Sequence, residues 1–342
     1  MSRPTIHDVA RVAGVSLSTV DRVLNGRVGV REGTQLRVAE AMRTLGYERN
    51  VAAANLSRRR QYRLRFFLPS GSNSFMRGLE DRVRERMAVA GRDSTVIEVT
   101  TVPPFDAPAL AAELRGLCAD AVDGVAIVAT DATAIRVAVQ DLRARGIAVV
   151  TLVSDLPSSE RQHFVGIDNV QAGRTAASLL GRFCRWRPGR IALVAGSMLV
   201  RDHVERRLGF EQVLRAEFPD QAIGATIEGL DDQDIVEERL RTILAEDPGI
   251  TGIYSFGAGN RGVARAVSGL SPDRRPAVVV HELTHYSRDA LLDGVFDAVI
   301  HQDDAREVDV AIRTLRALAD GESPDGAAER IGVEVFLRDN LP

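Results

Sequence analysis

Three short stretches of this chain carry residue types whose spacing could do chemistry. The first is VVVHELTHYS, in which His281, Glu282 and His285 match the H-E-x-x-H pattern of zinc proteases. In that chemistry two His side chains one helical turn apart bind Zn²⁺, and the Glu acts as general base. The pattern requires a helix that begins before the first His. Here Pro276 and the β-branched run 278–280 lead into His281 and predict a strand instead, so a zinc metalloprotease is the weaker alternative.

The second stretch is GIYSFGAGNRGVARAV, in which Gly257, Gly259 and Gly262 spell G-x-G-x-x-G between a predicted strand and a predicted helix. With Glu282 at the end of the next strand, it is close to a dinucleotide-binding fingerprint. That fingerprint usually opens its domain, whereas this one falls in the third strand–helix unit of a second series. An NAD-dependent oxidoreductase is therefore the alternative, and we prefer a glycine-rich loop that lets the backbone approach a small ligand.

The third stretch is GVSLSTVDRVLNG, residues 14–26, whose apolar residues have the spacing of the inner face of a short helix. Its outer face carries Leu17, Ser18 and Arg22. A helix-turn-helix motif explains this, because the start of its second helix faces base edges in the major groove. Arg22 could then contact a guanine through two hydrogen bonds. A three-helix interaction module with a solvated Arg22 is the alternative.

Charge and composition agree with a DNA-binding end on a globular body. The first 65 residues hold 13 Arg against 5 Asp and Glu, although the whole chain has a net charge of -3. A basic end of this kind suggests contact with a polyanion. We find no apolar run near the length of a membrane span and no secretory signal, so we expect a cytoplasmic protein. Cys118 and Cys184 are expected to be buried small hydrophobic residues in a reducing compartment.

The predicted elements change type near residue 63. Residues 1–60 are expected to be helical, with helices capped by Thr5 and Ser16, a third helix from Gly33 to Leu45, and a weaker one from Asn50 to Leu56. Strands then alternate with amphipathic helices, which requires parallel sheets. The strands are expected at 64–69, 94–102, 123–130, 147–153 and 163–168, and in a second series at 190–196, 222–229, 252–256, 277–282 and 297–302. We expect an all-α headpiece followed by α/β structure in two doubly wound lobes, which bind ligands at the carboxyl ends of strands.

These features together resemble the lactose-repressor (LacI/GalR) family of bacterial transcription regulators. The run TIHDVARVAGVSLSTVDRVLNG is similar to the family's headpiece nearly residue by residue, and NVAAANL looks like its hinge helix. The resemblance implies a helix-turn-helix headpiece over 1–47, a hinge over 48–62, and a two-lobed effector-binding and dimerisation domain over 63–342, like periplasmic binding proteins of type I. Lobe 1 would comprise about 63–168 and 303–328, and lobe 2 about 169–302 and 329–342.

The resemblance also assigns roles on DNA. Leu17, Ser18 and Arg22 match the family's major-groove readers, and Leu56, with Ala53 beside it, matches its minor-groove wedge. One departure is Asp21, where the family usually has Ser and where a carboxylate should repel phosphate. The expected DNA-binding residues are Thr5, Ser16, Leu17, Ser18, Thr19, Arg22, Asn25, Thr34, Ala53 and Leu56.

The effector domain is similar to the ribose-type binding proteins. SGSNSFMRGL matches the loop that packs an aromatic ring on the sugar, here Phe75. TLVSDLP matches a loop that usually carries Asp where Val153 stands, so Asp155 is expected to serve instead. Arg206 matches the family's ligand-binding Arg. The expected effector-binding residues are Asn73, Ser74, Phe75, Asp155, Arg201, His203, Arg206, Asn260, Glu282 and Gln302.

The residue types fit a polyhydroxylated ligand independently of the resemblance. Each hydroxyl both donates and accepts, so a sugar site needs planar bidentate groups and an aromatic face. We therefore predict a sequence-specific DNA-binding regulator, expected to be a repressor, under the control of a small sugar, polyol or sugar acid. The expected partners are a near-palindromic double-stranded operator and a second copy of the chain. No membrane, cofactor, metal or catalytic residue is expected.

Overall fold

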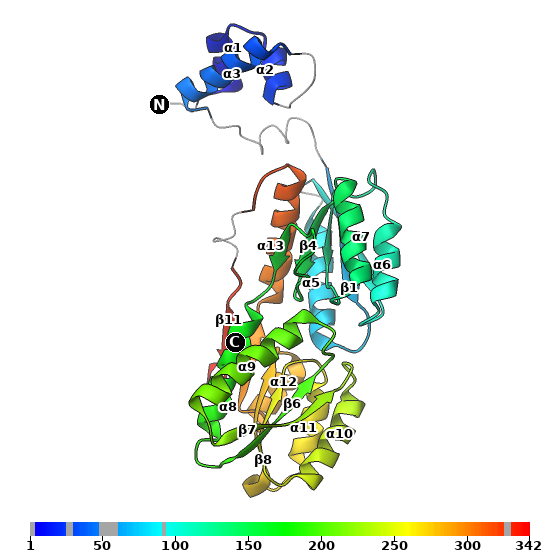
Figure 1. The fold of residues 1–342 in the computed structure, drawn as a ribbon, viewed down its shortest axis with the longest axis vertical. Coiled ribbons are helices and arrows are strands. Elements are labelled where there is room, and N and C mark those ends of the chain that lie inside the picture. The colour runs from blue at the N-terminus through cyan, green and yellow to red at the C-terminus, as the bar shows by residue number, and fades with distance from the viewer. Residues whose placement is uncertain (1–3, 25–29, 48–60, 91–93, 325–329) are drawn as a thin grey trace. The chain divides into compact units, whose positions relative to one another are not determined.

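The computed structural model describes residues 4–24, 30–47, 61–90, 94–324 and 330–342 (Figure 1). The chain divides into two compact units, Met1–Arg60 and Gln61–Pro342. Each unit is taken by itself below.

The first unit is a small helical domain. Its helices are α1 (Ile6–Ala13), α2 (Leu17–Leu24) and α3 (Glu32–Leu45). Thr5 and Asp8 form a capping box at the start of α1, and Gly14 ends this helix with a φ of +64° that favours glycine. Val9, Val20 and Val38, one from each helix, are fully buried in its core. The helix-turn-helix fold predicted from the sequence is therefore confirmed, while the segment 50–56 lies outside the described residues.

The second unit begins with a five-stranded parallel sheet, which with its helices we call lobe 1. Its order is β2-β1-β3-β4-β5. Helices α6 and α7 lie on one face of the sheet, and α5 and α13 on the other (Figure 1), and each pair contributes to a separate hydrophobic cluster. The strands are β1 (Tyr62–Pro69), β2 (Thr95–Val102), β3 (Gly124–Ile127), β4 (Ala148–Leu152) and β5 (His163–Val165), and the helices are α5 (Ser74–Ala90), α6 (Ala107–Arg115), α7 (Thr133–Ala144) and α13 (Asp304–Ala319).

A six-stranded sheet with its helices forms lobe 2. Its order is β11-β10-β9-β8-β6-β7, and every strand is parallel to its neighbours except β11, which pairs antiparallel with β10. Helices α8 and α9 pack on one face, and α10 to α12 on the other. The strands are β6 (Gly189–Ala195), β7 (Gln221–Glu228), β8 (Ile250–Ser255), β9 (Ala277–His281), β10 (Ala298–Gln302) and β11 (Val333–Phe336), and the helices are α8 (Asn169–Phe183), α9 (Arg201–Glu217), α10 (Gln233–Glu246), α11 (Asn260–Ser268) and α12 (His285–Leu292).

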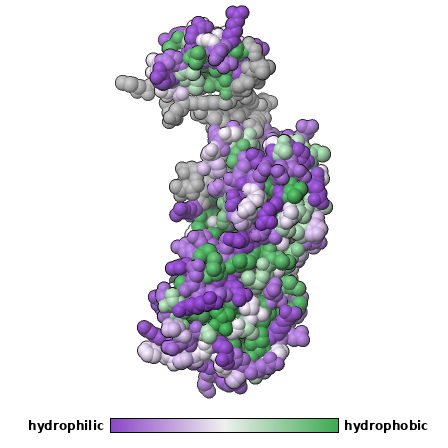
Figure 2. All heavy atoms as spheres, viewed as in Figure 1, coloured by the Kyte–Doolittle hydropathy of each residue, from purple (hydrophilic) through white to green (hydrophobic). Residues whose placement is uncertain are grey.

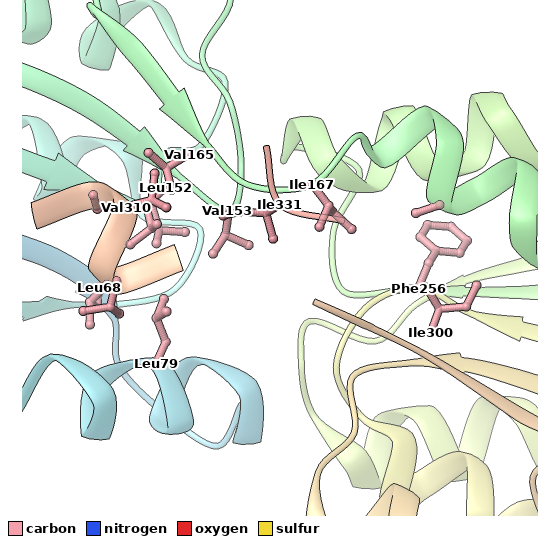
Figure 3. Packing of buried hydrophobic residues seen from close by; sticks show 14 of the residues in the cluster. Leu68, Leu79, Leu152, Val153, Val165, Ile167, Phe256, Ile300, Val310 and Ile331 are labelled. Carbon is pink, nitrogen blue, oxygen red and sulfur yellow. The ribbon is translucent and has the colours of Figure 1, made fainter. Parts of the chain in front are cut away.

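Three chain segments connect the lobes. They follow β5, β10 and α13, and two of them lie side by side, because Ile167 and Ile331 pair in a parallel bridge. Figure 3 shows these two residues between Val165 of lobe 1 and Phe256 of lobe 2, within one hydrophobic cluster. The carboxyl ends of the strands in both sheets therefore meet near these connections.

The surface has the mixed hydropathy of a globular protein. Hydrophilic residues predominate on the face shown in Figure 2, with hydrophobic residues in smaller patches. Among the described residues no helix is both long and apolar enough to cross a membrane.

Cys184 is buried, as expected, and burial raises the pKa of its thiol to about 11. Cys118 is exposed, so the prediction that it is buried is wrong.

Candidate functional site

The helical unit presents the predicted base-reading residues to solvent. Leu17, Ser18 and Arg22 on α2 are all exposed, and Leu17 remains 41% exposed although it is a large apolar residue. The Ser16 hydroxyl accepts a hydrogen bond from the Thr19 backbone N–H at 3.2 Å, which fixes the start of the helix. A short helix with this exposed face could enter the major groove.

The predicted phosphate contacts are distributed over the helix starts. Thr5 lies at the start of α1, where its hydroxyl is part of the capping box, and Thr34 lies half-buried in the first turn of α3. Nearby, Arg11 forms an ion pair with Asp8. Asn25, Ala53 and Leu56 lie outside the described residues.

A cavity of about 220 Å³ lies where the carboxyl ends of the two sheets meet. It is lined by the start of α5 from lobe 1, and by α9, α11 and the ends of β9 and β10 from lobe 2. Eight of the predicted effector-binding residues line it: Asn73, Ser74, Phe75, His203, Arg206, Asn260, Glu282 and Gln302.

Two predicted residues do not line this cavity. Asp155 is bound by Arg161 through two hydrogen bonds of 2.6 Å. Burial alone would raise the pKa of Asp155, but the hydrogen bonds from Arg161 and Thr151 hold it below its usual value. Arg201 pairs with Glu205 at 2.7 Å, one helical turn away on α9. Val153, which stands where the resemblance predicted an Asp, lines the cavity itself.

Arg206 lines the cavity and is only 3% exposed. Its Nε donates to Asn169 Oδ1 at 2.9 Å and its Nη1 donates to the Phe256 carbonyl oxygen at 3.0 Å. Close packing of α8 against α9 holds this arrangement, since a Cβ at Gly173 would lie 1.9 Å from the Arg206 carbonyl oxygen. Nη2 lies 3.8 Å from Glu282 Oε1.

The HELTH stretch contributes walls to the cavity. Glu282 accepts a hydrogen bond from Gln302 Nε2 at 2.6 Å, and Asn260 Nδ2 donates to the His281 carbonyl oxygen at 2.7 Å. His281 ends β9, where burial lowers its pKa well below its usual value. His285 is the exposed first residue of α12. Within the described ranges no group of three or more His, Cys, Asp or Glu side chains could hold a metal ion.

The glycines of GAGNRG are explained by backbone packing. A Cβ at Gly257 would lie 2.1 Å from the Gly196 nitrogen, and one at Gly262 would lie 2.0 Å from the Gln233 carbonyl oxygen. Neither position accepts a side chain. Gly257 therefore lets the loop after β8 pack against the end of β6, and Gly262 lets α11 pack closely on α10.

Sequence reasoning missed several residues of the cavity, above all Asp202, Asp231 and His281. Asp231 accepts a hydrogen bond from Asn73 Nδ2 at 2.8 Å and thereby joins lobe 2 to lobe 1. The signal for it was present, because Asp231 follows the end of a strand, as the other cavity residues do.

Several buried polar atoms around the cavity have no hydrogen-bond partner among the described residues. Leaving such an atom unsatisfied costs about 1–3 kcal/mol. Both donors and acceptors are present, and all of them except the Asn169 amide belong to residues that line the cavity, which suits a small molecule with hydroxyl groups. These atoms are Asn169 Nδ2, Asp202 Oδ1, Arg206 Nη2, His281 Nδ1 and Gln302 Oε1.

Two family profiles match this chain. The profile of the periplasmic binding protein domain matches residues 64–323, and that of the bacterial regulatory proteins of the lacI family matches residues 5–50. The first unit thus has the sequence pattern of a regulator, and the second that of a ligand-binding domain.

Curated relatives are bacterial regulators. The HTH-type transcriptional regulator RegA of Clostridium saccharobutylicum is 44% identical over 81 residues, 22% of this chain and 24% of RegA. Catabolite control protein A of Streptococcus mutans is 28% identical over 202 residues, 57% of this chain and 55% of that protein. The chain therefore matches about a quarter of the length of the first and about half of the second.

Solved structures share the fold of the second unit. GanP, a glucose-galactose binding protein from Geobacillus stearothermophilus, has a TM-score of 0.73 at 21% identity and covers 83% of this chain and 99% of its own. A putative LacI transcriptional regulator from Bacteroides fragilis has a TM-score of 0.70 at 15% identity, with 82% and 98% covered. The predicted pair of α/β lobes is confirmed.

Proposed function

We propose that this chain, which belongs to the periplasmic binding protein domain family over residues 64–323 and matches the lacI family of bacterial regulatory proteins over residues 5–50, regulates transcription under the control of a small sugar-like effector. In this proposal α2 reads the operator, and the cavity between the lobes binds the effector. The protein acts as a repressor, and it acts on bacterial DNA and therefore in the cytoplasm.

The observation that carries the proposal is the exposed side of α2. Leu17, Ser18 and Arg22 are turned to solvent on a helix whose opposite side is buried, and they lie within the segment that matches the lacI profile. A single exposed Leu is common on protein surfaces, and it is the position of the three side chains on the outer face of the second helix of a helix-turn-helix that favours a role at base edges. These side chains match what base edges offer, namely hydrogen-bond acceptors and methyl groups.

The cavity supports the proposal that the second unit binds a small sugar-like effector. Its carboxylates, amides and guanidinium group are the planar bidentate groups that a sugar, polyol or sugar acid requires, and Phe75 supplies an aromatic face. We further propose that these residues bind a ligand without reacting with it and that the protein is not an enzyme, as its similarity to regulators and binding proteins favours. We also propose a homodimer, because two identical headpieces would match a near-palindromic operator.

A binding-site selection with the purified full-length protein tests the DNA half. We expect one enriched, near-palindromic sequence. Arg22→Ala should relax base preference at one position of each half-site, since a bidentate Arg–guanine contact contributes about 1–3 kcal/mol of discrimination. Arg11→Ala is the matched control, because Arg11 is paired with Asp8. Enrichment of no sequence over random DNA, with or without candidate effectors, would contradict the proposal.

A further inference from the structure

The cavity has an acidic interior and a basic mouth. Asp202 and Glu282 line it and are only 6% and 8% exposed, and half-buried Asp231 lines it as well. Arg206 is the buried guanidinium that faces them. Among the described residues the interior therefore holds three carboxylates against one guanidinium, which suits hydroxyl donors and repels an anion.

The mouth carries two exposed arginines, one from each lobe. Arg77 lies on α5 of lobe 1 and Arg261 on α11 of lobe 2, and both line the cavity. The Arg77 guanidinium donates a 3.3 Å hydrogen bond to Ser74 Oγ, and that of Arg261 lies over the ring of Tyr286, 5.0 Å from its centroid. Within the described ranges neither forms an ion pair with a carboxylate.

Other arginines on the same two helices are paired. On α5, Arg82 pairs with Glu85 at 3.1 Å, and on α11, Arg265 pairs with Glu237 at 2.5 Å. Two guanidinium groups without a carboxylate thus occur where these helices reach the cavity. An exposed guanidinium is best matched by a carboxylate or a phosphate, which can accept two parallel hydrogen bonds.

We propose that the effector carries an anionic group, a carboxylate or a phosphate, which Arg77 and Arg261 hold at the mouth while its hydroxylated end occupies the acidic interior. This inference rests on the proposed function of the cavity. Because the two arginines come from different lobes, the anion would bind both and hold the lobes together. A neutral sugar could still bind the interior, but with lower affinity.

Calorimetry on the full-length protein with matched ligands tests this. The panel consists of pentoses and hexoses, each with its aldonate and its phosphate ester. We expect an acid member to bind more tightly than its neutral parent, and the preference to weaken at high salt because the mouth is exposed. Whether the aldonate or the phosphate binds better identifies the anionic group, and either result supports the proposal.

Variants of the mouth locate the effect. In the double variant Arg77→Met, Arg261→Met, the ratio of acid to neutral affinity should fall about tenfold, while affinity for the neutral parent changes less than about twofold. Arg82→Met and Arg265→Met on the same helices are the controls and should keep the ratio. Equal binding of acid and neutral members, or a ratio that survives the double variant, would overturn the anion site. Failure of every member to bind the wild-type protein would instead contradict the effector role of the cavity, and the anion site with it.

Discussion

At the scale of single residues, three non-glycine residues that line the cavity, Val153, Asp231 and Glu282, are held in an unusual backbone conformation. Val153 and Glu282 follow the carboxyl ends of β4 and β9 with φ angles of +64° and +72°, a region that non-glycine residues rarely adopt. Such conformations persist only where the surroundings stabilise them, and they are common at binding sites. Here they place residues of both lobes on the wall of the same cavity.

Glu282 is the residue whose removal should separate the two activities. We expect Glu282→Ala to reduce effector affinity by about 10- to 150-fold, because a hydrogen bond to a charged group contributes about 1.5–3 kcal/mol. DNA affinity without effector should be unchanged. Calorimetry measures the effector affinity, and a DNA-binding titration measures the DNA affinity. An effector affinity equal to that of the wild type would show that Glu282 does not bind the effector.

Glu307 is a second unusual residue, on α13 close to the cavity. It is fully buried, and neither carboxyl oxygen has a hydrogen-bond partner among the described residues. Burial and the nearby charge of Glu282 raise the pKa of Glu307 well above its usual value of 4.5. The folded protein therefore keeps a proton that the unfolded chain loses, so stability falls as pH rises above 4.5 and through the folded pKa.

Glu307→Gln should remove this dependence. We expect the variant to unfold about 2–4 °C higher than the wild type near neutral pH, with a difference that shrinks as pH falls towards the usual pKa of Glu. Thermal unfolding followed across this pH range gives the comparison. A difference that does not vary with pH would show that the carboxyl does not titrate as described.

The sequence predicts residues of the cavity from their position at or just after the end of a predicted strand. Phe75, Asn260, Glu282 and Gln302 all lie at or just beyond a strand end and reach the cavity. Asp155 also lies just beyond a strand end, but its carboxylate accepts hydrogen bonds from Arg161, six residues further along, and does not reach the cavity. Competition of this sort among side chains depends on loop geometry, which the sequence does not show.

At the scale of elements, helix ends were the most predictable features. Thr5 and Ser16 begin helices in the structure as predicted, because each has a hydroxyl that accepts a hydrogen bond from the backbone of the first turn. The predicted end of the third helix at Leu45 is also observed, and Gly46 follows it with a φ of +61° that favours glycine. The strand β11 was not predicted. Its four residues, VEVF, are too short to show a period, and they pair antiparallel in a chain of otherwise parallel strands.

The capping box of α1 makes a prediction about acid. Hydrogen bonds from the Thr5 backbone and side chain, with help from Arg11, lower the pKa of Asp8 from 3.8 to about 2. Its contribution to the helix is therefore present above pH 4 and lost as pH falls towards 2. In Asp8→Ala we expect faster hydrogen exchange of the α1 amides at neutral pH than in the wild type, and a smaller change on acidification. Equal hydrogen-exchange rates in both proteins would show that the capping box does not stabilise α1.

At the scale of the whole second unit, hydrogen bonds bridge the two lobes around the cavity. Ser154 of lobe 1 accepts one from the Arg201 backbone N–H at the start of α9 at 3.2 Å, and Asp131 N–H donates to the Leu199 carbonyl oxygen at 3.1 Å. With the Asn73–Asp231 pair, these bonds favour the closed arrangement in which the cavity is formed. A ligand that binds only this arrangement shifts the equilibrium towards it.

Ser154→Ala should weaken closure without touching the 220 Å³ cavity, since Ser154 does not line it. We expect effector affinity to fall about five- to tenfold, because loss of a buried hydrogen bond costs about 1–1.5 kcal/mol in the closed state only. Small-angle scattering should show a larger radius of gyration for the unliganded variant. Unchanged scattering and affinity would mean that this bond does not stabilise closure.

The position of α13 in the chain has a consequence for biosynthesis. Val308, Ala311 and Leu315 on this helix complete the hydrophobic core of lobe 1, yet they are translated after the last of the parallel strands of lobe 2. The ribosome must therefore release nearly the entire polypeptide before lobe 1 can complete the burial of its second face. Until then α5 is the helix that covers this side of the sheet, and a chain that stops before residue 304 leaves the part under α13 exposed to non-native contacts.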